Sequence, residues 1–136
     1  MASIHKEVPI AAPAEEVWAA LREVANVHRL FPGVLVDARL EGNTRVVSFA
    51  NGLVVRERII AVDEERRRVA YAVLRDGLVH HSASMQVFAE GRVGSRFVWI
   101  SDFLPDDLAA SFGPLIDQGA AALKRALEDP DRRGGL

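Results

Sequence analysis

The chain has 136 residues, of which 49% are hydrophobic and 26% charged. These values are typical of one globular domain that can bury a sizeable core. A formal net charge of −2 gives no basic footprint, so we expect no nucleic-acid partner. The chain has no cysteine, which excludes disulfides and thiolate metal sites and agrees with a cytoplasmic location. No apolar run reaches signal-peptide length or the roughly 18 residues of a membrane span, so we expect no integral membrane association.

The N-terminal quarter predicts a strand followed by short helical segments. Apolar side chains alternate over residues 3–10, which is typical of a strand. Pro13 suits the first turn of a helix, and apolar residues then recur at helical spacing from Val17 to Phe31. A Pro-Gly pair at 32–33 ends this pattern. The segment is either one broken helix or two short ones.

Between residues 34 and 104 the apolar period changes to two, which indicates strands. Six strands are predicted, at residues 34–40, 44–49, 53–62, 67–75, 80–88 and 95–104. The Asn-Gly pair at 51–52 and the Asp-Gly pair at 76–77 are strong hairpin signals, because type I′ turns need positive φ at both central positions. The connections are too short for parallel crossovers. We therefore expect an antiparallel meander.

After Pro105, an apolar stripe at helical spacing predicts a long C-terminal helix. Gly113-Pro114 should kink or divide this helix. It is the only large element that can cover the apolar face of the sheet. The expected fold is α+β: a curved seven-stranded antiparallel sheet wrapped around the long helix, with two short helices after strand 1 and a cavity between sheet and helix. Residues 1–129 should form this single domain, and 130–136 a flexible tail.

This order of elements resembles the START-like superfamily of polyketide cyclases/dehydrases and lipid-transport proteins (SRPBCC), which has the helix-grip fold. Four segments carry the resemblance: VPIAAPAEEVWAALREVANVHRLFPGV (8–34), NGLVVRERIIAVDEERRRVAYAV (51–73), SRFVWISDFLP (95–105) and GAAALKRALE (119–128). The resemblance covers nearly the whole chain and implies an interior cavity. It further implies a small, largely apolar ligand that is polyketide-, aromatic- or lipid-like. None of the segments is a catalytic signature, since a fold does not determine a function.

Glu57 is the most informative polar residue of the predicted sheet. In strand 53–62, Arg56 and Arg58 lie on one side, so the other side should face the core and carry Glu57 inward. Leu53, Val55, Ile59 and Ala61 share that side. A buried carboxylate needs a partner or has a raised pKa. It could act as a general acid/base, anchor a polar group of the ligand, or simply pair with a neighbouring arginine.

Two further residues are candidates for proton transfer. His81 shares the apolar side of strand 80–88 and should point inward, with His80 outward; a core histidine without function is the alternative. The side on which Tyr71 lies depends on the turn. A two-residue turn at 76–77 places Tyr71 on the outer face, whereas a bulge or a longer loop places it beside His81. The candidate catalytic residues are thus Glu57, His81 and Tyr71.

The apolar part of the site comes from parity in the strands and from the inner stripe of the C-terminal helix. The predicted ligand-binding residues are Val55, Ile59, Met85, Phe97, Trp99, Phe112, Ile116 and Leu123. The four histidines show no metal-ligand spacing, and the glycines form no phosphate-binding motif, so we expect neither metal nor cofactor.

Three functions fit these residues. The first is an acid/base enzyme that assists a cyclisation, dehydration or isomerisation without metal or nucleotide. The second is a carrier or sensor in which the same residues only orient a hydrophobic ligand. The third is an interaction domain with a vestigial cavity. The residues favour ligand binding with acid/base chemistry as an open question, in a monomer or homodimer.

Overall fold

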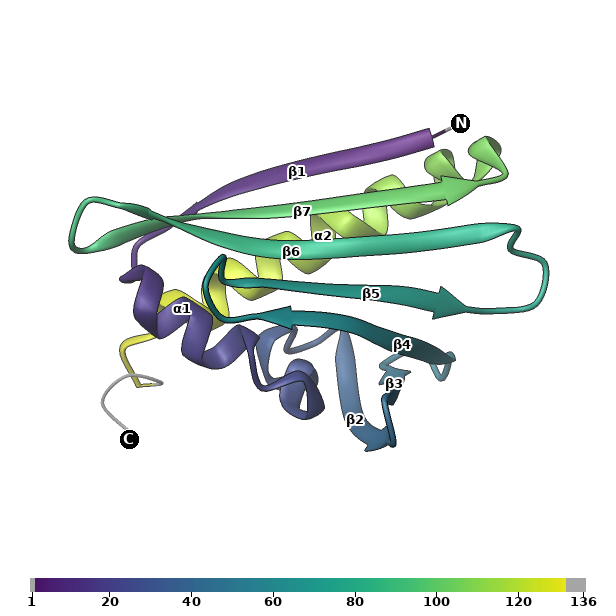
Figure 1. Ribbon diagram of the computed structural model, residues 1–136, viewed down its shortest axis with the longest axis horizontal. Helices are drawn as coiled ribbons and strands as arrows, with labels where there is room; N and C mark the ends of the chain where they lie inside the picture. Colours follow the sequence, from purple (N-terminus) through teal and green to yellow (C-terminus); the bar gives the residue numbers. More distant parts are fainter. Residues whose placement is uncertain (1, 132–136) are drawn as a thin grey trace.

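The computed structural model describes residues 2–131 as a seven-stranded antiparallel sheet that curves around one long helix (Figure 1). The elements in chain order are β1 (Ala2–Ile10), α1 (Ala14–Leu21), the 3₁₀ segment η1 (Val24–Leu30), β2 (Leu35–Glu41), β3 (Thr44–Phe49), β4 (Val54–Asp63), β5 (Arg68–Leu74), β6 (His80–Glu90), β7 (Gly94–Leu104), η2 (Asp106–Leu108) and α2 (Ala109–Glu128). The strand order is β1-β7-β6-β5-β4-β3-β2. The predicted helix-grip fold is confirmed. Of the predicted tail, residues 132–136 lie outside the described residues.

Two short helical elements follow β1, as one of the sequence alternatives predicted. Pro13 precedes α1 in an extended conformation, and Glu15 and Glu16 lie in its positively polarised first turn. Val17 and Leu21 are buried on its inner face. Non-helical dihedral angles at Asn26 interrupt η1. The chain therefore bends twice before it enters β2.

The C-terminal helix is not divided at Gly113-Pro114, which excludes one of the two predicted outcomes, division or a kink. α2 runs without interruption from Ala109 to Glu128, with Pro114 inside it. Pro114 is only the sixth residue of the helix, so its missing N–H removes one backbone hydrogen bond near the helix start. The buried stripe further along, which includes Ile116 and Leu123, holds the helix against the sheet.

Strands β2 to β7 form a meander with register shifts in β2 and β4, and the shift in β4 changes the side that residues face. The β4–β5 register shifts between Ile59 and Ala61. Beyond that point Ala61 pairs with Ala70, and Val62 pairs with the buried Val69. The prediction that Ala61 faces the core is therefore wrong. An extra residue in one strand reverses the alternation that parity assumes.

The core lies mainly at one end of the molecule, where α1 contacts β6 and β7 (left in Figure 1). Its most deeply buried side chains come from α1, β7 and α2 and include Val17, Phe97 and Leu123. The opposite end carries the β5–β6 loop and the start of α2. Core packing therefore closes one end of the space under the sheet, and the β5–β6 loop and the start of α2 border the other end.

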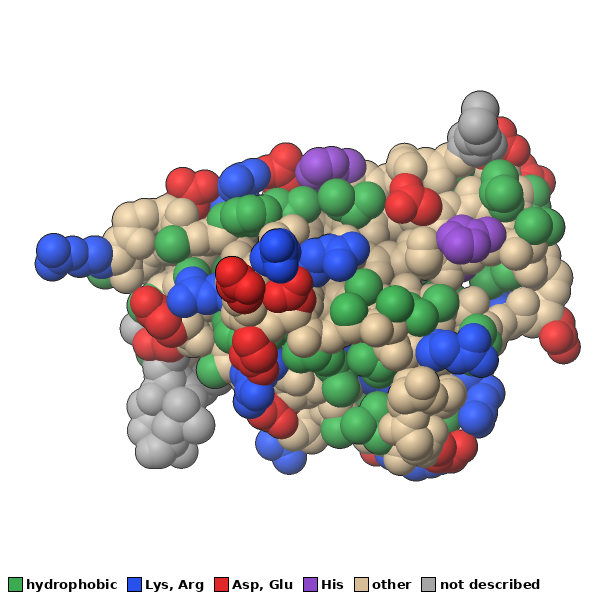
Figure 2. Space-filling view, in the orientation of Figure 1, with side chains coloured by type: hydrophobic (Ala, Val, Ile, Leu, Met, Phe, Trp, Pro, Cys, Tyr) green, Lys and Arg blue, Asp and Glu red, His purple; other side chains and the backbone are tan. Residues whose placement is uncertain are grey.

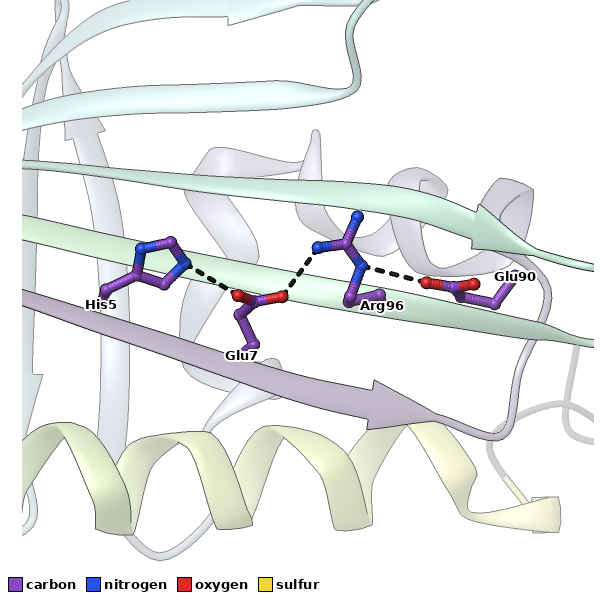
Figure 3. Close-up of polar contacts among 4 residues, drawn as sticks. All are labelled: His5, Glu7, Glu90 and Arg96. Carbon is purple, nitrogen blue, oxygen red and sulfur yellow. Dashed lines mark hydrogen bonds and ion pairs between the residues drawn. The ribbon is translucent and has the colours of Figure 1, made fainter.

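The outer face of the sheet carries charged side chains of both signs among hydrophobic ones (Figure 2). One chain of ion pairs crosses β1, β7 and β6 (Figure 3). It links His5 to Glu7 at 3.1 Å, Glu7 to Arg96 at 2.7 Å and Arg96 to Glu90 at 3.0 Å. All four side chains are largely exposed, and such pairs contribute little to stability. Within residues 2–131, no helix is long and apolar enough to cross a membrane.

Candidate functional site

A cavity of about 180 Å³ lies between the concave face of the sheet and α2. One water needs only about 10–15 Å³ by this measure, so the space holds far more than a single solvent molecule. Its wall is formed by η1, the strands from β2 to β7 and the first half of α2. Most of the lining is apolar. The polar side chains in it that can take part in proton transfer or ion pairing are Arg45, Glu57, Tyr71, Arg75 and His81.

A buried ion pair between Arg45 and Glu57 is the most polar feature of the cavity wall. Nε and one terminal nitrogen of Arg45 lie 2.8 and 2.7 Å from Oε1 of Glu57. The side chains are 3% and 12% exposed. Arg45 also donates to the carbonyl of Val24 in η1 at 3.2 Å. Glu57 thus faces inward as parity predicted, and its charge has a cationic partner.

The loop between β3 and β4 brings the two residues of this pair opposite each other. The N–H of Phe49 donates to the carbonyl of Leu53 at 2.8 Å, which closes a three-residue loop. Gly52 has φ of +93° there, a conformation that glycine adopts without strain. In the resulting register, Arg45 lies directly across from Glu57.

Sequence reasoning missed Arg45. A two-residue turn at Asn51-Gly52 would have placed Arg45 opposite Arg58 instead of Glu57. The signal that could have found it is parity in 44–49, where Arg45 shares a side with Val47 and Phe49.

Two opposing effects act on the carboxyl group of Glu57. Burial raises the pKa of Glu57, and the guanidinium of Arg45 works against that rise. Both contacts with Arg45 use Oε1. Within residues 2–131, Oε2 accepts no hydrogen bond, so it remains available to a polar group in the cavity.

Tyr71 lies on the inner face, which decides the alternative that the sequence left open. The β5–β6 connection spans residues 75–79 and is longer than the two-residue turn. It sets Tyr71 opposite Ala83, on the same side as His81. The indole Nε1–H of Trp99 donates to the Tyr71 hydroxyl at 3.2 Å, and the guanidinium of Arg45 lies 5.2 Å from the ring centroid.

Burial, followed by the nearby charge of Glu57, raises the pKa of Tyr71 far above its ordinary value. The phenol is therefore neutral and keeps its proton, because deprotonation would put a second anion beside Glu57. A role for Tyr71 as a base at neutral pH does not fit this environment.

His81 also faces the cavity, on the other side of β5 from Glu57. Its ring stacks on Phe112 of α2 at 5.1 Å and lies 5.7 Å from Phe103 of β7. Burial, with a smaller effect from His80, lowers the pKa of His81, so the ring is neutral near pH 7. His80 points outward and pairs with Ser82 at 3.0 Å.

The predicted apolar residues divide between the cavity and the core. Val55, Met85, Trp99, Phe112 and Ile116 line the cavity.

Phe97 and Leu123 do not line it, because both have 0% exposure and belong to the core at the closed end. Ile59 packs against that core beside the bulge. Parity identifies the inner face of each strand, but it does not say how far the cavity extends along that face.

The described residues offer no metal centre. Within 2–131, no three His, Asp or Glu side chains gather closely enough to hold a metal ion. The cavity side chains that can supply hydrogen bonding, charge or proton transfer include Glu57, Arg45, Tyr71 and His81.

The polyketide cyclase / dehydrase and lipid transport family matches residues 1–128. The chain belongs to this family. The match covers the whole sheet and all of α2, the elements that enclose the cavity.

Solved structures with the same fold include proteins of different kinds. XoxI from Bacillus cereus is 20% identical, with a TM-score of 0.83 over 95% of this chain and 97% of that one. The di-domain ARO/CYC protein BexL is 19% identical, with a TM-score of 0.82 over 96% of this chain and 48% of that one.

Norcoclaurine synthase from Thalictrum flavum, in complex with dopamine and hydroxybenzaldehyde, is 21% identical, with a TM-score of 0.72 over 93% of this chain and 84% of that one. At these identities the likeness shows the fold alone.

Proposed function

We propose that this protein binds a small, largely apolar ligand of aromatic or polyketide-like character in the cavity between the sheet and α2. The observation that carries the proposal is an apolar cavity whose wall contains one compact polar cluster, Arg45, Glu57 and Tyr71. Ligand pockets commonly combine an apolar wall with a few placed polar groups that fix orientation. The same fold in norcoclaurine synthase holds dopamine and hydroxybenzaldehyde, which supports an aromatic ligand.

Each member of the cluster would have a distinct part in holding the polar group of the ligand. Oε2 of Glu57 accepts a hydrogen bond from a ligand hydroxyl. The Tyr71 hydroxyl, whose oxygen already accepts from Trp99, donates its proton to a ligand oxygen. Arg45 opposes the effect of burial on the pKa of Glu57 and holds its carboxyl group in place. We further propose that the protein acts in the cytoplasm as a monomer or homodimer.

A cavity-filling variant tests the binding site. Val73 lines the cavity, so Val73→Trp should abolish binding of 2-naphthol measured by calorimetric titration. The matched control is Val93→Trp in the exposed β6–β7 turn, which should bind as the wild type does. If the wild type does not bind 2-naphthol or a set of larger polycyclic phenols, and native mass spectrometry finds no co-purified compound, the cavity is vestigial and the proposal fails.

A second candidate function is acid/base catalysis at the same cluster. The observation in its favour is that Glu57 is buried, with a raised pKa, and has one oxygen free of hydrogen bonds within residues 2–131. Such a carboxyl group is suited to moving a proton next to a carbonyl group. Tyr71 would stabilise the negative charge that develops on the carbonyl oxygen.

Exchange of α-protons separates the two functions. A small ring ketone, 2-tetralone, is incubated in D₂O, and the loss of its α-proton signals is followed by NMR. An enzyme would accelerate the exchange, and Glu57→Gln would abolish the acceleration while 2-naphthol still binds. A binding protein would show no acceleration with either form, and Glu57→Gln would only weaken binding.

A further inference from the structure

His81 is a polar group of the cavity that lies apart from the Arg45–Glu57–Tyr71 cluster. Glu57 is paired with Val73, and the β5–β6 register that sets Tyr71 opposite Ala83 places Val73 beside His81. Glu57 and His81 therefore lie two strands apart on the same face. With strands about 4.8 Å apart, their backbones are separated by roughly 10 Å across the curved sheet.

Aromatic contacts on two sides hold the His81 ring. Phe112 of α2 stacks on one face at 5.1 Å, with an interplanar angle of 29°. Phe103, directly across the β6–β7 ladder, approaches at 5.7 Å. Packing of this kind holds the plane of the ring in place before a ligand arrives.

Only one ring nitrogen of His81 is available to a ligand. Nδ1 is buried and has no hydrogen-bond partner within residues 2–131. A buried N–H without an acceptor is rarer in proteins than an acceptor without a donor. This favours the tautomer with its proton on Nε2. Because His81 lines the cavity, Nε2–H is then the donor that its ring offers there.

The space between the two polar positions is apolar. Val73 lies between them on the sheet side, because it pairs with Glu57 and lies beside His81. Ile116 lines the cavity from α2. A ligand that reaches both positions therefore needs a flat apolar skeleton with polar groups on opposite edges.

We propose that His81 donates a hydrogen bond from Nε2 to an oxygen atom at the second end of the ligand, so that the cavity selects skeletons with two oxygen substituents on opposite edges. This inference rests on the proposed binding function and adds to it a specificity-determining residue and a ligand class.

Two compounds that differ in one hydroxyl group test it. 2-Naphthol and 2,6-dihydroxynaphthalene share a ring system, and only the second carries oxygen on both edges. The wild type should bind the diol about two- to tenfold more tightly, the difference expected of one neutral hydrogen bond. His81→Phe keeps the aromatic packing and should remove that preference, so that the variant binds the two compounds equally tightly. His80→Phe makes the same change on the outer face and should retain the preference.

The outcomes separate this inference from the proposed function. If wild-type protein binds both compounds equally, or if His81→Phe keeps the preference for the diol, His81 does not form a hydrogen bond with the second oxygen. The cavity would still bind ligands. If neither compound binds, both proposals fail for naphthalene phenols.

A measurement on the wild type avoids any dependence on the folding of a variant. In protein labelled with ¹⁵N-histidine, the diol should shift the Nε2 resonance of His81 and 2-naphthol should shift it less. Equal shifts with the two compounds would overturn the inference.

Discussion

Arg45 is almost fully buried and joins two parts of the molecule. Its guanidinium contacts Glu57 on β4 and the carbonyl of Val24 in η1, and it lies over the ring of Tyr71. Burying two charges is costly, and removal of one partner leaves the other charge uncompensated. The ion pair therefore maintains the polar end of the cavity more than it adds to stability.

Arg45→Leu should lower the free energy of unfolding by about 3–5 kcal/mol, because Glu57 remains buried without its cation. The double variant Arg45→Leu/Glu57→Leu should recover most of that loss, since no charge is left in the apolar surroundings. Urea unfolding measures both. Arg39→Leu, which removes an exposed partner of Glu41, is the control and should have little effect. A double variant as unstable as the single one would contradict this account.

The neutral state of His81 makes stability depend on pH. Burial lowers the pKa of His81 in the folded state below the ordinary value of about 6.5 that the unfolded chain keeps. The stabilisation of the folded state by neutral His81 is complete above about pH 6.5. It is lost as the pH falls from that value towards the lower pKa of the folded state, because the unfolded chain binds the proton more readily.

His81→Phe should therefore reduce the drop in melting temperature between pH 7.5 and pH 5. His80→Phe, on the outer face, should leave the drop unchanged. If the melting temperatures of the wild type and His81→Phe fell by the same amount between pH 7.5 and pH 5, His81 would have its ordinary pKa in the folded protein.

Connections and bulges, and not strand patterns, decide which side chains meet. Alternation correctly predicted that Glu57 and His81 face inward. It could not place Tyr71, whose side depends on whether the β5–β6 connection has two residues or five. It also placed Ala61 wrongly, because the bulge in β4 adds one residue to the count. Loop length and bulges arise from local backbone geometry and from packing of distant elements, which the pattern of one strand does not contain.

The helix α2 packs tightly against Trp99 of β7 at Gly119. A Cβ atom there would lie 3.2 Å from Cζ3 of Trp99 and 3.6 Å from Cδ1 of Phe31. A glycine inside a helix is usually less stable than alanine by roughly 1 kcal/mol. The close approach to Trp99 is the physical reason for a glycine at this point of α2.

Gly119→Ala should stabilise the protein less than a Gly→Ala substitution inside a helix normally does, because Trp99 must move to make room. Ala121→Gly, at an exposed position of α2, measures the ordinary difference between the two residues and should lose about 1 kcal/mol. Urea unfolding gives both values. The NMR signal of the Trp99 indole N–H should move in Gly119→Ala, since its bond to Tyr71 is disturbed. If Gly119→Ala gained the full value of about 1 kcal/mol expected from helix propensity and the Trp99 signal did not move, this explanation would be excluded.

The most deeply buried side chains of the molecule and its ligand space lie towards different ends. Val17, Phe97 and Leu123 are buried near the end that α1 closes, and the cavity extends towards the β5–β6 loop and the start of α2. Where the two meet, core residues such as Val55 and Met85 also line the cavity. The same helix serves both ends, with Leu123 fully buried in the core and Leu115 half exposed beside the cavity.

Two identical substitutions on α2 should therefore act differently. Leu123→Ala should cost about 2–5 kcal/mol of unfolding free energy, as truncation of a fully buried leucine does. Leu115→Ala should cost much less and should weaken 2-naphthol binding. Chemical unfolding and calorimetric titration of both variants give the comparison. Similar losses of stability for the two would show that core and cavity are not separate.

This division has a consequence for how the domain can diverge. Side chains at the open end, such as Leu53, Leu78 and Leu115, shape the ligand space and are partly exposed. Exchanging them leaves the packed end intact, so a library randomised at these positions should consist mostly of folded proteins. Selection for a new small molecule then draws on variation that protein folding does not constrain.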